Sequence, residues 1–153
     1  MRHVCEIEIE KPVDVVVRLF DDPDNMGKWM PGLRGFEHLS GEPGQPGSRS
    51  RLNFDINGRK LEMIETITVR DLPGEFSGTY EAPGVFNTIT NSFEEIDGGT
   101  RWVAENEFRF SSLMMKMMSF LMPGAYRKQT VEHMQAFKGF AESIDTNSGE
   151  EDE

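Results

Sequence analysis

The spacing of apolar residues changes along this chain, and each change predicts a different type of element. Over residues 2–10 apolar and charged residues alternate, which is typical of a strand with one buried face. Helical spacing follows from Val13 to Phe20, and it ends before Pro23, because the residue preceding a proline avoids the helical region. A second short apolar group lies at 26–30. The pattern therefore predicts one strand followed by two short helices.

Strand-like segments then fill the middle of the chain, each ended by a short run of turn-forming residues. They lie at residues 34–40, 48–56, 59–70, 75–82, 85–96 and 100–110. Asn57-Gly58 separates the second segment from the third, and this dipeptide is the strongest short hairpin signal. Strands joined by tight turns pair antiparallel. The segments thus predict a meander of about six strands after the first strand.

The last part of the chain returns to helical spacing. Residues 112–122 form a methionine-dense segment, and 125–144 follow as a helix of about 20 residues, roughly 30 Å long. The apolar line of that helix is formed by Tyr126, Thr130, His133, Phe137, Phe140 and Ile144. A long amphipathic helix that covers one face of an antiparallel sheet predicts an α+β fold.

The charge of the chain excludes some classes of function. Asp and Glu number 27 against 16 Lys and Arg, a formal net charge of −11, which disfavours nucleic-acid binding because phosphates are neutralised by clustered basic residues. Five of the acids lie in residues 145–153, a run without apolar residues. We expect a single domain over residues 1–144 and an acidic disordered tail over 145–153.

Location and ligands are also limited by what the sequence lacks. No run approaches 18 apolar residues, and the charged start does not match a signal peptide, so we expect a cytoplasmic protein without stable membrane insertion. A single cysteine, Cys5, excludes an internal disulfide and a cysteine-based zinc cluster. We expect no metal and no cofactor, and a monomer or a homodimer.

The order of these elements resembles the START/Bet v 1-like superfamily, and in particular its polyketide cyclase/dehydrase-type (SRPBCC) members. The resemblance covers about residues 2–144. Local features that carry it are Ile9-Glu10-Lys11-Pro12-Val13, Trp29-Met30-Pro31-Gly32, Gly47-Ser48, Asp71-Leu72-Pro73 and Gly98-Gly99-Thr100-Arg101. It implies a helix-grip fold, in which a curved antiparallel sheet of about seven strands wraps the long C-terminal helix and leaves an apolar cavity.

The same resemblance implies two alternative functions. Members of the superfamily bind lipids, sterols, aromatic polyketides or similar molecules, and some catalyse cyclisation or dehydration. We therefore expect binding or transport of a hydrophobic small molecule, with a cyclase/dehydratase-type enzyme as the alternative. Because one fold serves both, the choice depends on the residues of the cavity.

Two titratable residues fall on apolar faces and are candidates for catalysis. In 59–70 Glu65 shares a face with Leu61, Met63, Ile67 and Val69, whereas Arg70 lies on the other face. Burial would raise the pKa of Glu65 and suit it to acid–base work, although a bulge or an outward ion pair is the alternative. His133 lies in the apolar line of the last helix, where a packed core histidine is the alternative to a proton-transfer partner of Glu65.

Further candidates would line the cavity around a ligand. Asn87, Asn91 and Asn106 share inward faces with apolar residues and could orient a polar group, or could pair with one another or with the backbone. The full set of expected ligand-binding residues is Trp29, Phe54, Met63, Glu65, Tyr80, Asn87, Ile89, Asn91, Trp102, Asn106, Met118, Tyr126, Thr130, His133 and Phe137. The methionine-dense segment could act as a lid, as a partner surface, or simply pack against the sheet edge.

Overall fold

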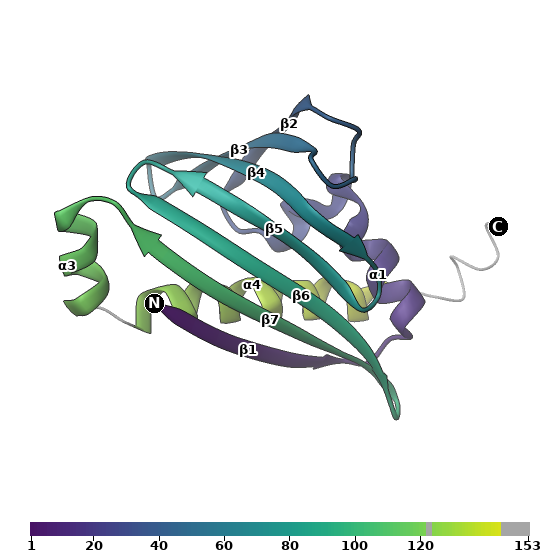
Figure 1. The fold of residues 1–153 in the computed structure, drawn as a ribbon. Helices are drawn as coiled ribbons and strands as arrows, with labels where there is room; N and C mark the ends of the chain where they lie inside the picture. The colour runs from purple at the N-terminus through teal and green to yellow at the C-terminus, as the bar shows by residue number, and fades with distance from the viewer. Residues whose placement is uncertain (122–123, 145–153) are drawn as a thin grey trace.

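Seven antiparallel strands form one curved sheet, with a long helix along one of its faces (Figure 1). The computed structural model describes residues 1–121 and 124–144, except the side chains of Met114, Met115, Met118 and Ser119. The elements are β1 (Arg2–Ile9), α1 (Val13–Asp21), η1 (Pro23–Asn25), α2 (Met26–Trp29), β2 (Leu33–Ser40), β3 (Arg49–Ile56), β4 (Arg59–Asp71), β5 (Glu75–Ala82), β6 (Val85–Ile96), β7 (Gly99–Phe110), α3 (Leu113–Leu121) and α4 (Gly124–Ser143). The acidic tail predicted for 145–153 lies outside the described residues.

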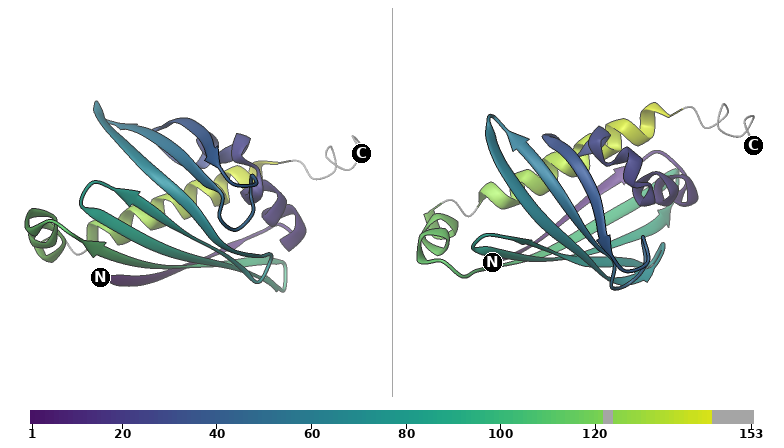
Figure 2. Two further views of the ribbon diagram at one scale, coloured as in Figure 1. Left: turned by 45° about the horizontal axis from the view of Figure 1, so that its top comes forward. Right: turned by 90° about the horizontal axis from the view of Figure 1, so that it is seen from above.

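The strands follow the order β1-β7-β6-β5-β4-β3-β2, so β2 to β7 form a meander and β1 pairs with its last strand. Figure 2 shows α4 running along the sheet, with α1 near one end of the molecule and α3 at the other. This is the predicted α+β helix-grip arrangement. Among the described residues, no helix is both long enough and apolar enough to cross a membrane.

Local sequence accounts for the main turns and faces. Cys5 and Ile9 are buried on β1 while its acidic residues are exposed, as the alternation predicts. The hairpin between β3 and β4 has φ +54° at Asn57 and φ +84° at Gly58. Left-handed conformations at both central residues are what a two-residue hairpin of this type requires. The hairpin prediction is therefore confirmed.

A bulge in β4 overturns the predicted faces of its last residues. Ile67 pairs with Gly78, but the next pair joins Val69 to Ser77, so one extra residue is inserted. Arg70 therefore lies on the cavity side, and Val69 is 37% exposed, contrary to the prediction that Val69 faces inward and Arg70 outward. A two-residue alternation cannot anticipate such an insertion, because it reverses every face beyond it.

Arg70 is held by residues far away in the sequence. Its guanidinium donates to both carboxylate oxygens of Asp21, at 2.7 and 2.6 Å, and to the carbonyl oxygen of Gly44 at 3.1 Å. The Asp21 carboxylate raises the pKa of Arg70. This paired hydrogen bonding fastens the end of α1 to β4 and to the loop between β2 and β3.

An aromatic cluster forms the centre of the core between the helices and the sheet. The ring of Phe137 on α4 lies 5.3 Å from Trp29 and 5.4 Å from Trp102, centroid to centroid. Phe20 on α1 lies 5.0 Å from Phe93 and also contacts both tryptophans. Edge-to-face pairs at these distances add to the stabilisation from burial. The cluster connects α1, α2 and α4 to the last two strands.

The two C-terminal helices differ from the prediction in detail. On α4 the fully buried residues are Met134, Phe137 and Ala141, so the buried line is rotated relative to the predicted one, and His133 is only half-buried. On α3 four apolar side chains are exposed: Leu113, Met117, Phe120 and Leu121. The prediction that the methionine-dense segment packs against the sheet edge is therefore wrong for these four side chains.

Candidate functional site

Two adjoining chambers lie between the sheet and the helices. One, of about 290 Å³, is lined by Glu65 and is named the Glu65 chamber. The other, of about 280 Å³, is lined by His133 and is named the His133 chamber. Their walls share Phe20, Trp29, Met30, Tyr80, Ile89 and Asn91. Each chamber is close to the lower end of the volume range of small-molecule sites.

Glu65 and Tyr80 form a hydrogen-bonded pair in the wall. They are directly opposite on β4 and β5, and the hydroxyl of Tyr80 donates to Oε2 of Glu65 at 2.6 Å. Burial raises the pKa of Glu65 above its ordinary 4.5, and the hydrogen bond from Tyr80 opposes this rise. Burial, together with the neighbouring carboxylate, raises the pKa of Tyr80 well above 10. The pair therefore places a carboxyl group with a raised pKa beside the cavity.

His133 lies in the wall of the other chamber. Burial lowers its pKa below the ordinary 6.5, and the charge of Glu132 opposes this change. Its ring nitrogens have no hydrogen-bond partner in the described part of the chain. The structure does not bring His133 and Glu65 into contact, because each lines a different chamber. Their roles in catalysis stay predictions.

The three inward asparagines are held differently. Asn91 donates to the carbonyl oxygen of Phe76 at 3.3 Å and accepts from Nε1 of Trp102 at 2.9 Å. Asn87 donates to Oδ1 of Asn106 at 3.2 Å and to backbone carbonyl oxygens. The alternative that these amides pair with neighbours or with the backbone is thus confirmed, and because they also line the chamber, orientation of a ligand's polar group stays a prediction.

The structure places most of the expected ligand-binding residues in the walls. Those in the His133 chamber are Trp29, Phe54, Met63, Tyr80, Asn87, Ile89, Asn91, Trp102, Asn106, Tyr126, Thr130 and His133. Glu65 lines the other chamber. Phe137 lines neither, because it is fully buried within the aromatic cluster. The side chain of Met118 lies outside the described residues.

Several wall residues were missed. The sequence predicts Phe20 and Met30 on apolar helix faces, but nothing in the pattern indicates that these faces line the cavity, as the structure shows they do. Met134 was missed because the apolar line of α4 is rotated. Asp21 and Arg70 were missed because their pairing depends on the bulge in β4. The alternations in 48–56, 59–70 and 100–110 could have identified further members, because Leu52, Leu61, Ala104 and Phe108 share faces with the residues that were chosen.

Comparison with known families agrees with this geometry. The family model described as "polyketide cyclase / dehydrase and lipid transport" matches residues 4–136. The chain belongs to this family. The matched range contains both Glu65 and His133 and every strand from β2 to β7. No protein with a curated description matches the chain by sequence.

Solved structures share the fold at low sequence identity. The Zhui aromatase/cyclase from a Streptomyces species has a TM-score of 0.78 at 15% identity, with 93% of each chain covered. Major latex-like protein 151 from Panax ginseng has a TM-score of 0.74 at 15% identity, covering 92% of this chain and 97% of that one. Ara h 8.0201 has a TM-score of 0.72 at 14% identity, covering 94% and 99%. Similarity at this level establishes the helix-grip fold.

Proposed function

We propose that this protein binds a hydrophobic small molecule, such as a lipid or an aromatic or polyketide-like compound, in the two adjoining chambers. The observation that carries the proposal is the wall of the His133 chamber. Apolar side chains from β3, β4, β6 and β7 meet there, among them Leu52, Phe54, Met63, Ile89 and Phe108. Release of ordered water from such a wall favours binding of apolar surface.

The membership of the family supports the same proposal, because its description joins lipid transport to polyketide chemistry. The shared residues support a ligand that extends from one chamber into the other. Trp29 and Tyr80 lie at this junction and present large aromatic surfaces to both sides. A ligand longer than one chamber would contact both of them.

Binding is tested with the fluorescent probe 1-anilinonaphthalene-8-sulfonate (ANS). Ile89 is half-buried and lines both chambers, so Ile89→Trp places an indole in the shared space. We expect saturable ANS binding with one site in the wild type and binding at least about tenfold weaker in Ile89→Trp. A tenfold loss corresponds to about 1.4 kcal/mol, less than the burial of one large apolar side chain contributes.

Val4→Trp is the matched control. Val4 is also β-branched and on a strand, but it is 49% exposed and lines neither chamber. This variant should bind ANS as the wild type does. Equal binding by all three proteins would place the probe on the outer surface and would refute the proposal.

A second candidate function is favoured by Glu65. We propose as the alternative a cyclase/dehydratase-type enzyme in which the Glu65 carboxyl group exchanges a proton with a bound carbonyl compound. In such a dehydration a base removes a proton from the carbon beside the carbonyl group, the β-hydroxyl leaves with a proton as water, and a carbon–carbon double bond forms. The raised pKa of Glu65 suits a carboxyl group that exchanges a proton with a bound compound.

The enzymatic alternative is tested with 4-hydroxy-4-phenylbutan-2-one, whose dehydration to the conjugated enone is followed by ultraviolet absorbance. We expect turnover that Glu65→Gln abolishes. If His133 assists by proton transfer across the junction of the chambers, His133→Gln lowers kcat as well. Equal turnover by the wild type and Glu65→Gln would exclude this alternative. The proposal of ligand binding would still stand, because it is tested separately with ANS.

A further inference from the structure

Four large apolar side chains of α3 are exposed at one end of the molecule. They belong to Leu113, Met117, Phe120 and Leu121, which are between 56% and 84% exposed. Their spacing of i, i+4, i+7 and i+8 places them on one face of the helix. Single apolar residues scattered over a surface are normal, whereas a contiguous apolar face marks an interaction site.

Other exposed apolar residues lie at the same end of the molecule. Ile56 and Leu61, on either side of the β3–β4 turn, are exposed although both line the His133 chamber. Pro83, in the turn between β5 and β6, is likewise exposed and lines that chamber. The amide of Ser111, just before α3, donates to the carbonyl oxygen of Gly84 in the same turn at 3.0 Å. Figure 1 shows α3 and both turns at one end of the molecule, so the chamber reaches the surface beside α3.

This end of the chain is basic, although the protein as a whole is acidic. Residues 108–131 contain four basic residues, Arg109, Lys116, Arg127 and Lys128, and no acidic one. The other 12 of the 16 basic residues share the rest of the chain with all 27 acidic residues. All four side chains are exposed, and they lie at the end of β7, on α3 and at the start of α4.

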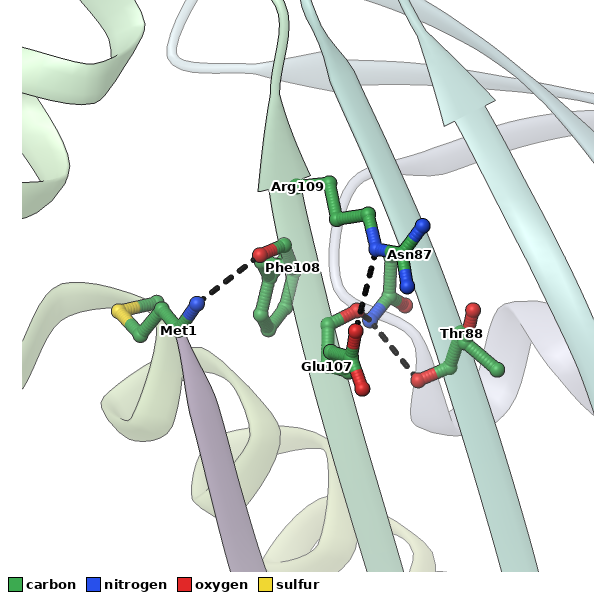
Figure 3. Close-up of polar contacts among 6 residues, drawn as sticks. All are labelled: Met1, Asn87, Thr88, Glu107, Phe108 and Arg109. Carbon is green, nitrogen blue, oxygen red and sulfur yellow. Dashed lines mark hydrogen bonds and ion pairs between the residues drawn. The ribbon is translucent and has the colours of Figure 1, made fainter.

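The contacts of these residues leave positive charge beside the apolar face. Arg109 is paired with Glu107, because its Nε donates to the carboxylate at 3.1 Å (Figure 3). Arg127 donates to the backbone carbonyl oxygen of Val4 at 3.1 Å, and this neutral acceptor does not cancel its charge. Lys116 directly precedes one of the exposed apolar residues of α3. The end of the molecule thus combines an apolar helix face with neighbouring positive charge.

We propose that α3 docks this protein reversibly on a bilayer that contains anionic phospholipids, with its apolar face in the interface and Lys116, Arg127 and Lys128 against the headgroups. Helices with an apolar face and basic neighbours lie in the plane of the interface, and anionic lipids attract their charges. With nine residues α3 is about 14 Å long, so it lies on the bilayer and does not cross it.

Charge also decides between a bilayer and a second copy of this chain. Two-fold pairing of two copies through α3 would bring their basic ends together, and juxtaposed like charges oppose association. An anionic surface instead attracts the same residues. The inference goes beyond the proposed ligand binding and does not rest on it, because the four exposed side chains of α3 line neither chamber.

Docking is measured by sedimentation of the protein with phospholipid vesicles at low salt. We expect the partition coefficient to be at least about tenfold higher for phosphatidylcholine vesicles with about one third phosphatidylserine than for vesicles of phosphatidylcholine alone. Added salt should weaken the binding, because it screens exposed charges. Equal binding to both kinds of vesicle, or binding to neither, would overturn the inference.

Two variants assign the binding to this surface. Phe120→Ser/Leu121→Ser removes two exposed apolar side chains and should lower the partition coefficient at least about tenfold, because interfacial binding scales with buried apolar area. Lys116→Gln/Lys128→Gln should remove most of the preference for phosphatidylserine. Urea unfolding of each variant checks that the fold is retained.

Leu39→Ser/Val69→Ser is the matched control for the apolar pair. Both side chains are also exposed and apolar, and both line neither chamber. Val69 lies beside Arg70, which binds Asp21 at the end of α1, so this site is at the opposite end of the molecule from α3. The control should bind the vesicles as the wild type does.

Binding of Phe120→Ser/Leu121→Ser at the level of the wild type would overturn the inference, because another surface would then contact the lipid. A wild type that binds no vesicles but forms a dimer, which the same variant dissociates, would overturn it as well and would identify α3 as an interface between copies. Neither result affects the proposed function, because ANS binding tests that function separately.

Discussion

The hydrogen bond from Tyr80 to Glu65 makes a prediction about how stability depends on pH. Tyr80→Phe removes only the hydroxyl that donates at 2.6 Å to the buried carboxyl group. When Glu65 is protonated, the loss is that of a neutral hydrogen bond, about 1 kcal/mol. When Glu65 is ionised, the loss is that of a hydrogen bond to a charged group, about 1.5–3 kcal/mol. The cost of Tyr80→Phe should therefore rise as Glu65 loses its proton.

The direction of the pH dependence follows from the raised pKa of Glu65. Below pH 4.5, the ordinary value, the carboxyl group is protonated in both the folded and the unfolded protein. As the pH rises above 4.5, the unfolded chain ionises first, so stability falls until the folded pKa is passed. Tyr80→Phe removes the hydrogen bond that lowers this pKa. The stability of the variant should therefore fall further than that of the wild type, and over a wider range of pH.

The assay is urea unfolding at steps from pH 5 to 9 for the wild type, Tyr80→Phe, Glu65→Gln and the double variant. We expect Tyr80→Phe to cost about 0.5–2 kcal/mol more at the highest pH than at the lowest. In the Glu65→Gln background its cost should be about 1 kcal/mol at every pH, because no titrating carboxyl group is left. A cost of Tyr80→Phe that is independent of pH in both backgrounds would refute this reasoning.

Further predictions concern stability elsewhere. Because burial lowers the pKa of His133 below 6.5, protonation of His133 opposes folding as the pH falls below 6.5, so the stability at pH 5 relative to pH 6.5 should be higher in His133→Gln than in the wild type. Phe137→Ala should cost about 3–5 kcal/mol in urea unfolding, whereas the 84% exposed Phe120→Ala should change stability by under about 0.5 kcal/mol. Gly78→Ala places a Cβ 2.8 Å from a carbonyl oxygen of β4 and should cost about 1–3 kcal/mol, whereas Gly27→Ala meets open space and should not destabilise.

Most of the fold could be predicted from the sequence because short local patterns of residues determine its strands, helices and turns. The alternation in β1 and the Asn57-Gly58 hairpin act over a few residues, and the structure confirms both. Family resemblance then supplied the global arrangement, since the order of elements is shared by the whole superfamily. The long helix was predicted to within one residue at each end.

The candidate site was predicted less completely because it depends on three-dimensional details. The bulge at Ile67–Val69 reverses the faces beyond it, and it alone brings Arg70 to Asp21. The buried face of α4 is rotated by less than one residue from the predicted face. Met134 therefore lies in the core, and His133 lies at the chamber wall. The pairing of Glu65 with Tyr80 required the register of β4 against β5, which no local pattern determines.

Ligand contact with Ile89 tests the central claim most directly. The measurement is ¹³C-methyl NMR of the protein with bound ANS, observing nuclear Overhauser effects between the probe and methyl groups. Ile89 lies at the junction of the two chambers, whereas Leu121 on α3 is 71% exposed. If the cavity is the binding site, the probe gives effects to Ile89 and none to Leu121. Effects to Leu121 with none to Ile89 would contradict the account.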